Sequence, residues 1–187
     1  RYKYRELASR FLAVEDQFET RGKISDTKAN TLYELFTATR DSPQRISDDV
    51  MTGYENIATE TLNRMVSVFD EDDRLLSSVG TIVVYYIAFR EQDFFDTVNR
   101  KMLSDFEELR RKASQMDDRD AGYSDPANLR LREYNSKVQS AHDGGALMRR
   151  VEILRGFVLG YLAEDKLAGL RFVSANEDFD SLEEEEA

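Results

Sequence analysis

The sequence predicts an all-α fold, an irregular bundle of five to seven helices. Apolar residues recur at three- and four-residue steps through most of the chain, which is the spacing of one buried helix face. Only two prolines and nine glycines occur in 187 residues, too few for the many tight turns of a sandwich or barrel. Because 41% of the residues are hydrophobic, the chain can build a core. We expect one helical bundle domain over residues 1–173 and a disordered acidic tail over residues 174–187.

Two helices and the start of a third are predicted at the beginning of the chain. Apolar residues at helical spacing predict the first helix over residues 2–20, and Gly22 follows as a left-handed cap. A shorter helix is predicted over residues 27–40. Ser42 is a candidate N-cap with Pro43 at the first helical position, so we expect a long helix to begin there.

Residues 81–89 form the one ambiguous stretch. Their β-branched and aromatic side chains are typical of a strand. Their apolar part is much shorter than the roughly 20 residues that a membrane span requires. A strand flanked by helices would have no partner strand in this chain, so we predict a buried central helix.

Three further helices are predicted in the second half of the chain. The first runs from Asp93 to about Gln115 and is followed by a polar loop. Asp125 and Pro126 form a cap-and-proline start for the next helix. After a break at residues 140–145, the last strong helix repeats its apolar residues at steps of four and three.

The net charge of −11 is unevenly distributed. Seven of the negative charges lie in residues 176–187, which contain no Lys or Arg, so the body carries only −4. Residues 127–163 are locally basic, with a net charge of +3. The chain has no cysteine, which excludes disulfides, thiol catalysis and cysteine-ligated metals and is compatible with the cytoplasm, where we expect the protein. We expect no membrane contact.

No catalytic constellation emerges from the residues. His142 is the only histidine, and we expect a solvated or capping role for it. The glycine-rich loops that cradle phosphates are absent. Asp93 and Asp96 share a helix face and are weak candidates for a magnesium site, although acidic residues are also favoured in the first turn by the helix dipole. We therefore predict no catalytic residue, no cofactor and no metal within this chain.

The basic segment is predicted to make protein contacts. Glu152 lies three residues from both Arg149 and Arg155, so it can pair with either on one helix face. That pairing leaves few free cations for phosphate groups, and direct nucleic-acid binding by this chain is expected to be weak or absent. We assign Arg149, Arg150 and Glu152 to an intramolecular or protein–protein contact.

Three stretches carry a family resemblance. They are residues 5–13, residues 131–135 followed by Gln139, Ser140 and Asp143, and residues 146–154 followed by Phe157 and Leu162. Together they resemble the helical C-terminal region of restriction and phage-defence proteins that have a GmrSD-type, ParB-like N-terminal domain. That domain carries the nucleotide-binding or nuclease residues of the family, around a D-G-Q-Q-R type motif that this chain lacks. The resemblance implies that Asn135, Gln139 and Asp143 organise the break between the last two helices.

The leading hypothesis is therefore a non-catalytic helical interaction or scaffold domain of a larger DNA-associated defence protein. Because the chain begins at Arg1, we expect it to be a piece of something longer. Its expected partner is the missing N-terminal domain or a second copy of itself. Two alternatives stay open: a metal-dependent nucleotide or nucleic-acid hydrolase using Asp93 and Asp96, and a free-standing helical regulator.

Overall fold

The computed structural model describes residues 2–41, 46–160, 167 and 170–171. These described residues form eight α-helices and two short 3-10 helices, and their one strand-like feature is an isolated bridge between Asp26 and Asp143. The all-α prediction is confirmed, with one helix more than the upper bound of the prediction. The predicted tail at residues 174–187 lies outside the described residues.

The chain divides into two compact units. Unit 1 comprises the described parts of residues 1–90 together with 140–148. Unit 2 comprises the described parts of residues 91–139 together with 149–187. The final long helix, α8 (Gly144–Gly160), contributes its first residues to unit 1 and the rest to unit 2.

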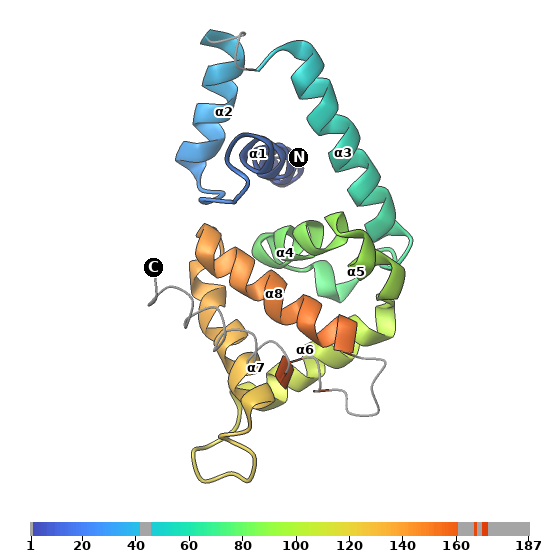
Figure 1. Cartoon of the computed structure of the whole chain (residues 1–187), viewed down its shortest axis with the longest axis vertical. Coiled ribbons are helices and arrows are strands. Elements are labelled where there is room, and N and C mark those ends of the chain that lie inside the picture. The colour runs from blue at the N-terminus through green and yellow to red at the C-terminus, as the bar shows by residue number, and fades with distance from the viewer. Residues whose placement is uncertain (1, 42–45, 161–166, 168–169, 172–187) are drawn as a thin grey trace, which may run out of the picture. The chain divides into compact units, whose positions relative to one another are not determined.

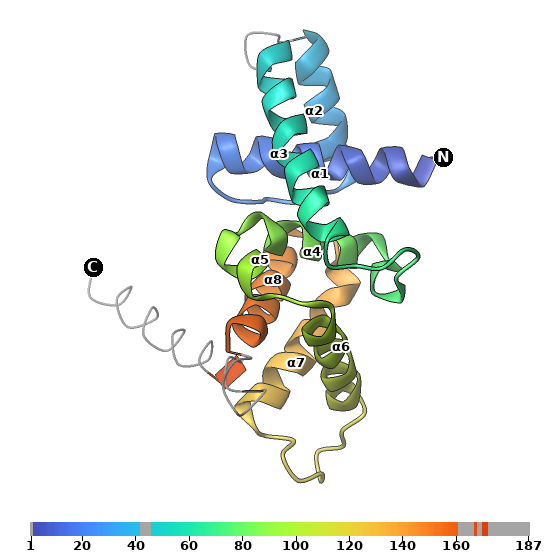
Figure 2. The same ribbon diagram turned by 90° about the vertical axis from the view of Figure 1, so that its right-hand side faces the viewer.

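In unit 1, α1 (Tyr2–Arg21) lies between α2 (Ala29–Asp41) and α3 (Asp48–Val66), and is seen end-on in Figure 1. Figure 2 shows α1 crossing behind α3. The chain then passes through a 3-10 turn, η1 (Arg74–Leu76), into α4 (Val79–Arg90). Aromatic contacts join these elements, since the rings of Phe11 and Tyr86 stack with centroids 4.2 Å apart.

Helix α4 confirms the buried central helix predicted for residues 81–89. Every residue from Val83 to Phe89 is buried, so apolar side chains occupy all faces of this helix. The sequence therefore shows neither the alternation of a strand nor the 3.6-residue period of an amphipathic helix. No helix in the part of the chain that the structure describes combines the length and apolar character needed to cross a membrane.

Helix α3 begins later than the sequence predicted. Its N-cap is Ser47, whose hydroxyl accepts a hydrogen bond from the Val50 amide at 3.3 Å, so Ile46 precedes the helix instead of lying within it. The predicted cap at Ser42 and Pro43 lies outside the described residues. By contrast, Gly22 has the positive φ of +66° predicted for a left-handed cap.

In unit 2 the predicted single helix from Asp93 to Gln115 is two helices, α5 (Gln92–Thr97) and α6 (Arg100–Ser114). The prediction was wrong because Asn99 adopts an extended conformation and its side chain accepts a hydrogen bond from the Met102 amide at 3.0 Å. That bond makes Asn99 an N-cap, which starts a new helix within a continuous apolar pattern.

Unit 2 also contains a helical hairpin, which packs with residues of α8 around an aromatic centre. Helix α6 and α7 (Pro126–Ser136) pack side by side and are joined by the loop at residues 115–125 (Figures 1 and 2). Asp125 caps α7 by accepting from the Ala127 amide at 2.8 Å, as the cap-and-proline pattern predicted. A 3-10 turn, η2 (Lys137–Ser140), follows. Phe106 contacts the rings of both Tyr134 and Phe157.

Candidate functional site

Arg149 joins α8 to α7 through a network of ion pairs. Its Nε and Nη2 atoms donate to the two carboxylate oxygens of Glu133 at 2.8 and 2.9 Å, which is a bidentate contact. Its Nη1 donates to Glu152 at 2.8 Å, and Glu133 also accepts from Arg130 at 2.9 Å. Every guanidinium nitrogen of Arg149 is therefore engaged within unit 2.

The network shifts the pKa values of Glu133 and Arg149. Partial burial would raise the pKa of Glu133, but its hydrogen bonds from Arg149 and Arg130 outweigh burial and hold that pKa below its ordinary value. Burial works against the charge of Arg149, yet its bonds to Glu133 and Glu152 raise its pKa. The charged forms of these side chains are thus favoured at neutral pH.

Arg150 is inside the protein. Its side chain is 1% exposed, its Nη2 donates to the Tyr134 hydroxyl at 3.3 Å, and its guanidinium lies 4.8 Å from the centre of the Tyr134 ring. Arg149 and Arg150 therefore do not form one surface patch, although the sequence places them side by side.

The predicted pairing of Arg155 with Glu152 is not the contact that the structure shows. Arg155 donates to Asp93 of α5 at 3.0 Å. Asp96, the other weak metal candidate, accepts from Gln92 at 2.6 Å. Within the described residues no three His, Cys, Asp or Glu side chains are grouped closely enough to hold a metal ion.

The three predicted loop residues lie in different places. Asn135 joins α7 to α6, because its amide donates to the Arg110 carbonyl at 2.8 Å and its carbonyl accepts from the Arg110 guanidinium at 2.6 Å. Asp143 caps α8 by accepting from the Ala146 amide at 3.2 Å. Gln139 is exposed at the end of η2.

His142 takes part in a contact that sequence reasoning missed. Its Nδ1 atom lies 3.0 Å from Nη1 of Arg10, a side chain that is 5% exposed and also donates to the Thr27 carbonyl and, at 2.6 Å, to Glu6. Since arginine has only donors, Nδ1 is the acceptor in this pair. The charged residue Arg10 sits on the apolar side of α1, three residues after Leu7, and that position is the signal in the sequence.

A second missed cluster lies between α1 and α4. Glu15 is 1% exposed and accepts hydrogen bonds from the Tyr86 hydroxyl at 2.6 Å and from Arg90 at 3.0 Å. Burial and the neighbouring Glu15 carboxylate raise the pKa of Tyr86, so its hydroxyl stays protonated and donates. Glu15 lies four residues after Phe11, on the apolar stripe of α1, and this spacing marks it as a buried acid.

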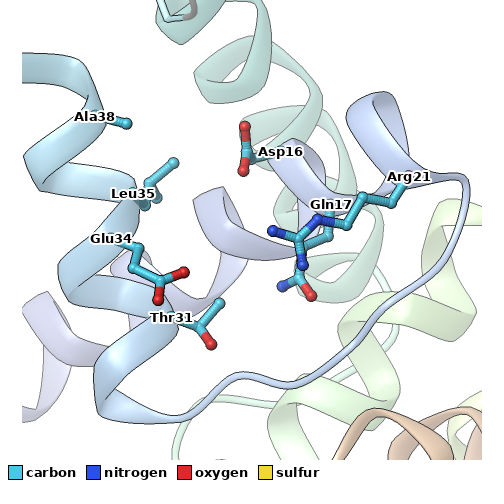
Figure 3. A pocket seen from close by; sticks show the side chains of 7 residues that line it. All are labelled: Asp16, Gln17, Arg21, Thr31, Glu34, Leu35 and Ala38. Carbon is cyan, nitrogen blue, oxygen red and sulfur yellow. The ribbon is translucent and has the colours of Figure 1, made fainter. Parts of the chain in front are cut away.

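A polar hollow of about 200 Å³ lies between α1 and α2 (Figure 3). Figure 3 shows Asp16 and Arg21 from α1 and Thr31 and Glu34 from α2 extending into the space between the helices. The complete lining is Asp16, Gln17, Arg21, Thr31, Glu34, Leu35 and Ala38. These residues come from two helices and share no spacing motif, so the hollow was not predicted from the sequence.

The structure thus offers two kinds of candidate site. In unit 2, the guanidinium of Arg149 is already bound by carboxylates of the same unit, whereas the hollow in unit 1 is open. Neither brings together the Asp93, Asp96 and His142 side chains. No family model matches the chain, and no curated protein or solved structure resembles it at a significant level.

Proposed function

We propose that this chain is a helical interaction and scaffold module without a catalytic role, forming the C-terminal part of a larger DNA-associated restriction or phage-defence protein. The resemblance of residues 5–13, residues 131–135 with Gln139, Ser140 and Asp143, and residues 146–154 with Phe157 and Leu162 to the helical region of that family supports this assignment. In this proposal the chain contacts another protein segment, and the missing N-terminal domain contacts the nucleic acid.

The observation that carries the proposal is that α2 is apolar on two faces. Its inner face buries Leu32 and Leu35, as a surface helix of a globular protein does. Its outer face exposes Tyr33 and Phe36, which are 69% and 49% accessible. Neighbouring exposed aromatic side chains on one helix are typical of a protein-contact surface.

The arginine network supports the part of the proposal that concerns nucleic acid. Affinity for phosphate groups grows with the number of cations that are free to displace counterions. Arg149 is held by two carboxylates, Arg150 is buried and Arg155 pairs with Asp93. These contacts engage three of the cations of residues 127–163 and so reduce the positive charge that this segment can offer to duplex DNA.

The first test is the reading frame that contains Arg1. The proposal expects it to continue upstream into a ParB-like domain with a D-G-Q-Q-R type motif. The encoded longer protein, with a protease site inserted before residue 1, should yield two fragments that elute together on gel filtration after cleavage. Fragments that separate, or a frame that lacks an upstream domain, would overturn the proposal.

Variants of the longer protein locate the contact. Tyr33→Ser combined with Phe36→Ser should release the cleaved fragment. Val66→Ser, at an exposed apolar residue on another helix, is the matched control and should leave the fragments associated. Release by the control alone, with the double variant still associated, would contradict the role given to α2.

A further inference from the structure

We propose that the hollow between α1 and α2 receives an arginine or lysine side chain from a partner protein segment, with an adjacent apolar residue of that segment lying against Tyr33. This inference rests on the proposed function, because both place a protein contact on α2. It names the residue chemistry of that contact, however, and short peptides test it without the partner.

Gln17 lines the hollow, and its side chain is hydrogen-bonded to the backbone of α1 and of the loop that follows it. Its amide nitrogen donates to the carbonyls of Ala13 and Asp26 at 2.9 and 2.8 Å. Its amide oxygen accepts from the backbone amides of Ser25 and Asp26 at 2.7 and 3.3 Å. All of its hydrogen-bonding capacity is used, so it offers nothing to a ligand.

The remaining polar groups are mostly acceptors. Thr31 donates its hydroxyl proton to Asp26, which leaves its oxygen as an acceptor. Glu34 has no hydrogen-bond or ion-pair partner among the residues that the structure describes. The only cation in the lining, Arg21, donates to the Ser25 hydroxyl at 3.3 Å. A hollow rich in acceptors is complementary to a ligand that donates several N–H bonds.

Negative charge lies on both walls of the hollow. Asp16 is on α1 and is 5% exposed, while Glu34 is on α2 and is exposed (Figure 3). The Asp16 carboxylate already accepts a hydrogen bond from the Tyr54 hydroxyl at 3.5 Å, so it contributes its charge to the wall of the hollow. Glu34 is the carboxylate with which an incoming guanidinium or ammonium group would pair.

The apolar requirement comes from a second, shallower hollow. It is lined by Tyr33, Glu34, Thr37, Ala38 and Asp41, and so shares Glu34 and Ala38 with the first. The two hollows are therefore neighbours along α2, one polar and one bounded by the exposed Tyr33 ring. A protein segment with a basic residue beside an apolar one fills both, whereas a free small cation fills only the first.

The test uses the full chain and a short probe. The peptide acetyl-Leu-Arg-Leu-amide is titrated into isotope-labelled protein at low salt, and backbone amide shifts are followed by NMR. We expect saturable shifts at Thr31, Leu35 and Ala38. The same peptide with citrulline, a neutral isostere of arginine, should bind at least about fivefold more weakly, as should the peptide at high salt.

Three controls decide between the alternatives. Glu34→Gln should weaken binding by about fivefold, while Glu19→Gln, at an exposed acid of α1 outside the hollow, should change it by less than about twofold. Agmatine, which carries the guanidinium without leucines, should bind more weakly than the peptide. Equal binding of the citrulline peptide, equal effects of the two variants, shifts elsewhere, or equal binding of agmatine would each overturn the proposal.

The peptide titration and the cleavage experiment test the two proposals separately. If the cleaved longer protein stays associated but the peptide does not bind, the interaction module stands and the basic side chain is wrong. If the peptide binds and the fragments separate, the hollow stands as a peptide site and the intramolecular role is wrong.

Discussion

The two units of this protein use charged side chains differently. In unit 1 the charges that organise the fold are buried, since Glu15 and Arg10 are 1% and 5% exposed. Glu15 is hydrogen-bonded to Tyr86 and Arg90 of α4, and Arg10 contacts Thr27 and His142. In unit 2 the carboxylates that join helices are nearer the surface, and the side chain of Glu133 is 29% exposed. Unit 1 also has an open polar hollow.

This difference sets how each unit should respond to change. Removing one partner of a buried charge pair leaves an uncompensated charge in a poorly solvated place and costs several kcal/mol. Surface ion pairs contribute about 1 kcal/mol or less each and weaken with salt and acid. Unit 1 should therefore be sensitive to single substitutions, and unit 2 to solution conditions.

The largest effect is expected from Gly144→Ala in unit 1. A Cβ at residue 144 would overlap the carbonyl oxygens of Ile24 and Ser25, and Gly144 also donates to the Ser25 carbonyl at 2.9 Å. Because both obstacles are backbone atoms, the loop must move, and we expect a loss of about 3 kcal/mol or more in the free energy of unfolding. Urea denaturation of the full chain measures it.

Gly53→Ala is the matched control for that substitution. A Cβ there meets no atom within 4 Å, and the residue lies inside α3. Alanine should stabilise the protein by about 0.5–1 kcal/mol through its higher helix propensity. Equal destabilisation by both substitutions would show that the close approach at Gly144 does not hold unit 1 together.

The second effect is expected from Glu15→Gln, which removes the charge that faces Arg90. Arg90 is 19% exposed, so it is partly shielded from water and loses its ion pair at 2.9 Å. We expect a loss of about 2–3 kcal/mol and faster hydrogen exchange in α1 and α4. Glu60→Gln breaks an ion pair whose acid is 68% exposed, and it should cost less than about 0.5 kcal/mol.

These contacts also show what the sequence could predict. The amphipathic stripes of α1 and α6 and the caps at Gly22 and Asp125 follow from local spacing and cap chemistry. The helical state of α4 follows instead from the lack of a partner strand, because its apolar run has no helical period. The start of α3 at Ser47 and the break at Asn99 were missed because a polar residue inside an apolar pattern can be either a cap or a solvated helix residue. Local spacing does not separate these two states.

Less of the candidate site than of the fold could be predicted from the sequence. The pairing of Arg149 with Glu152 follows from three-residue spacing, whereas its bond to Glu133 joins residues 16 apart in the sequence. Likewise, Arg10 and His142 are 132 residues apart, and the hollow needs α1 and α2 together. Contacts between elements depend on how helices pack, which spacing along one helix does not contain.

The third effect, in unit 2, is expected from Asn135→Ala. This change removes both hydrogen bonds that join α7 to α6 at Arg110. Because the side chain is only partly buried, water replaces part of what is lost, and we expect a cost of about 1–2 kcal/mol. Ser136→Ala, at the next and exposed residue of α7, should cost less than about 0.5 kcal/mol in the same urea titration.

The smallest effect concerns acid and Glu133. Its pKa is lowered in the folded protein, because bonds from Arg149 and Arg130 outweigh the effect of burial. The carboxylate therefore stabilises the fold fully above its unfolded pKa of about 4.3, and this contribution disappears as pH falls through the lower folded pKa. We expect Glu133→Gln to cost about 1 kcal/mol at neutral pH and almost nothing near pH 3. Glu152→Gln, at a more exposed acid of the same network, should cost less than about 0.5 kcal/mol at neutral pH. An equal cost of Glu133→Gln at both pH values would mean that packing, and not the charge on this carboxylate, joins α7 to α8.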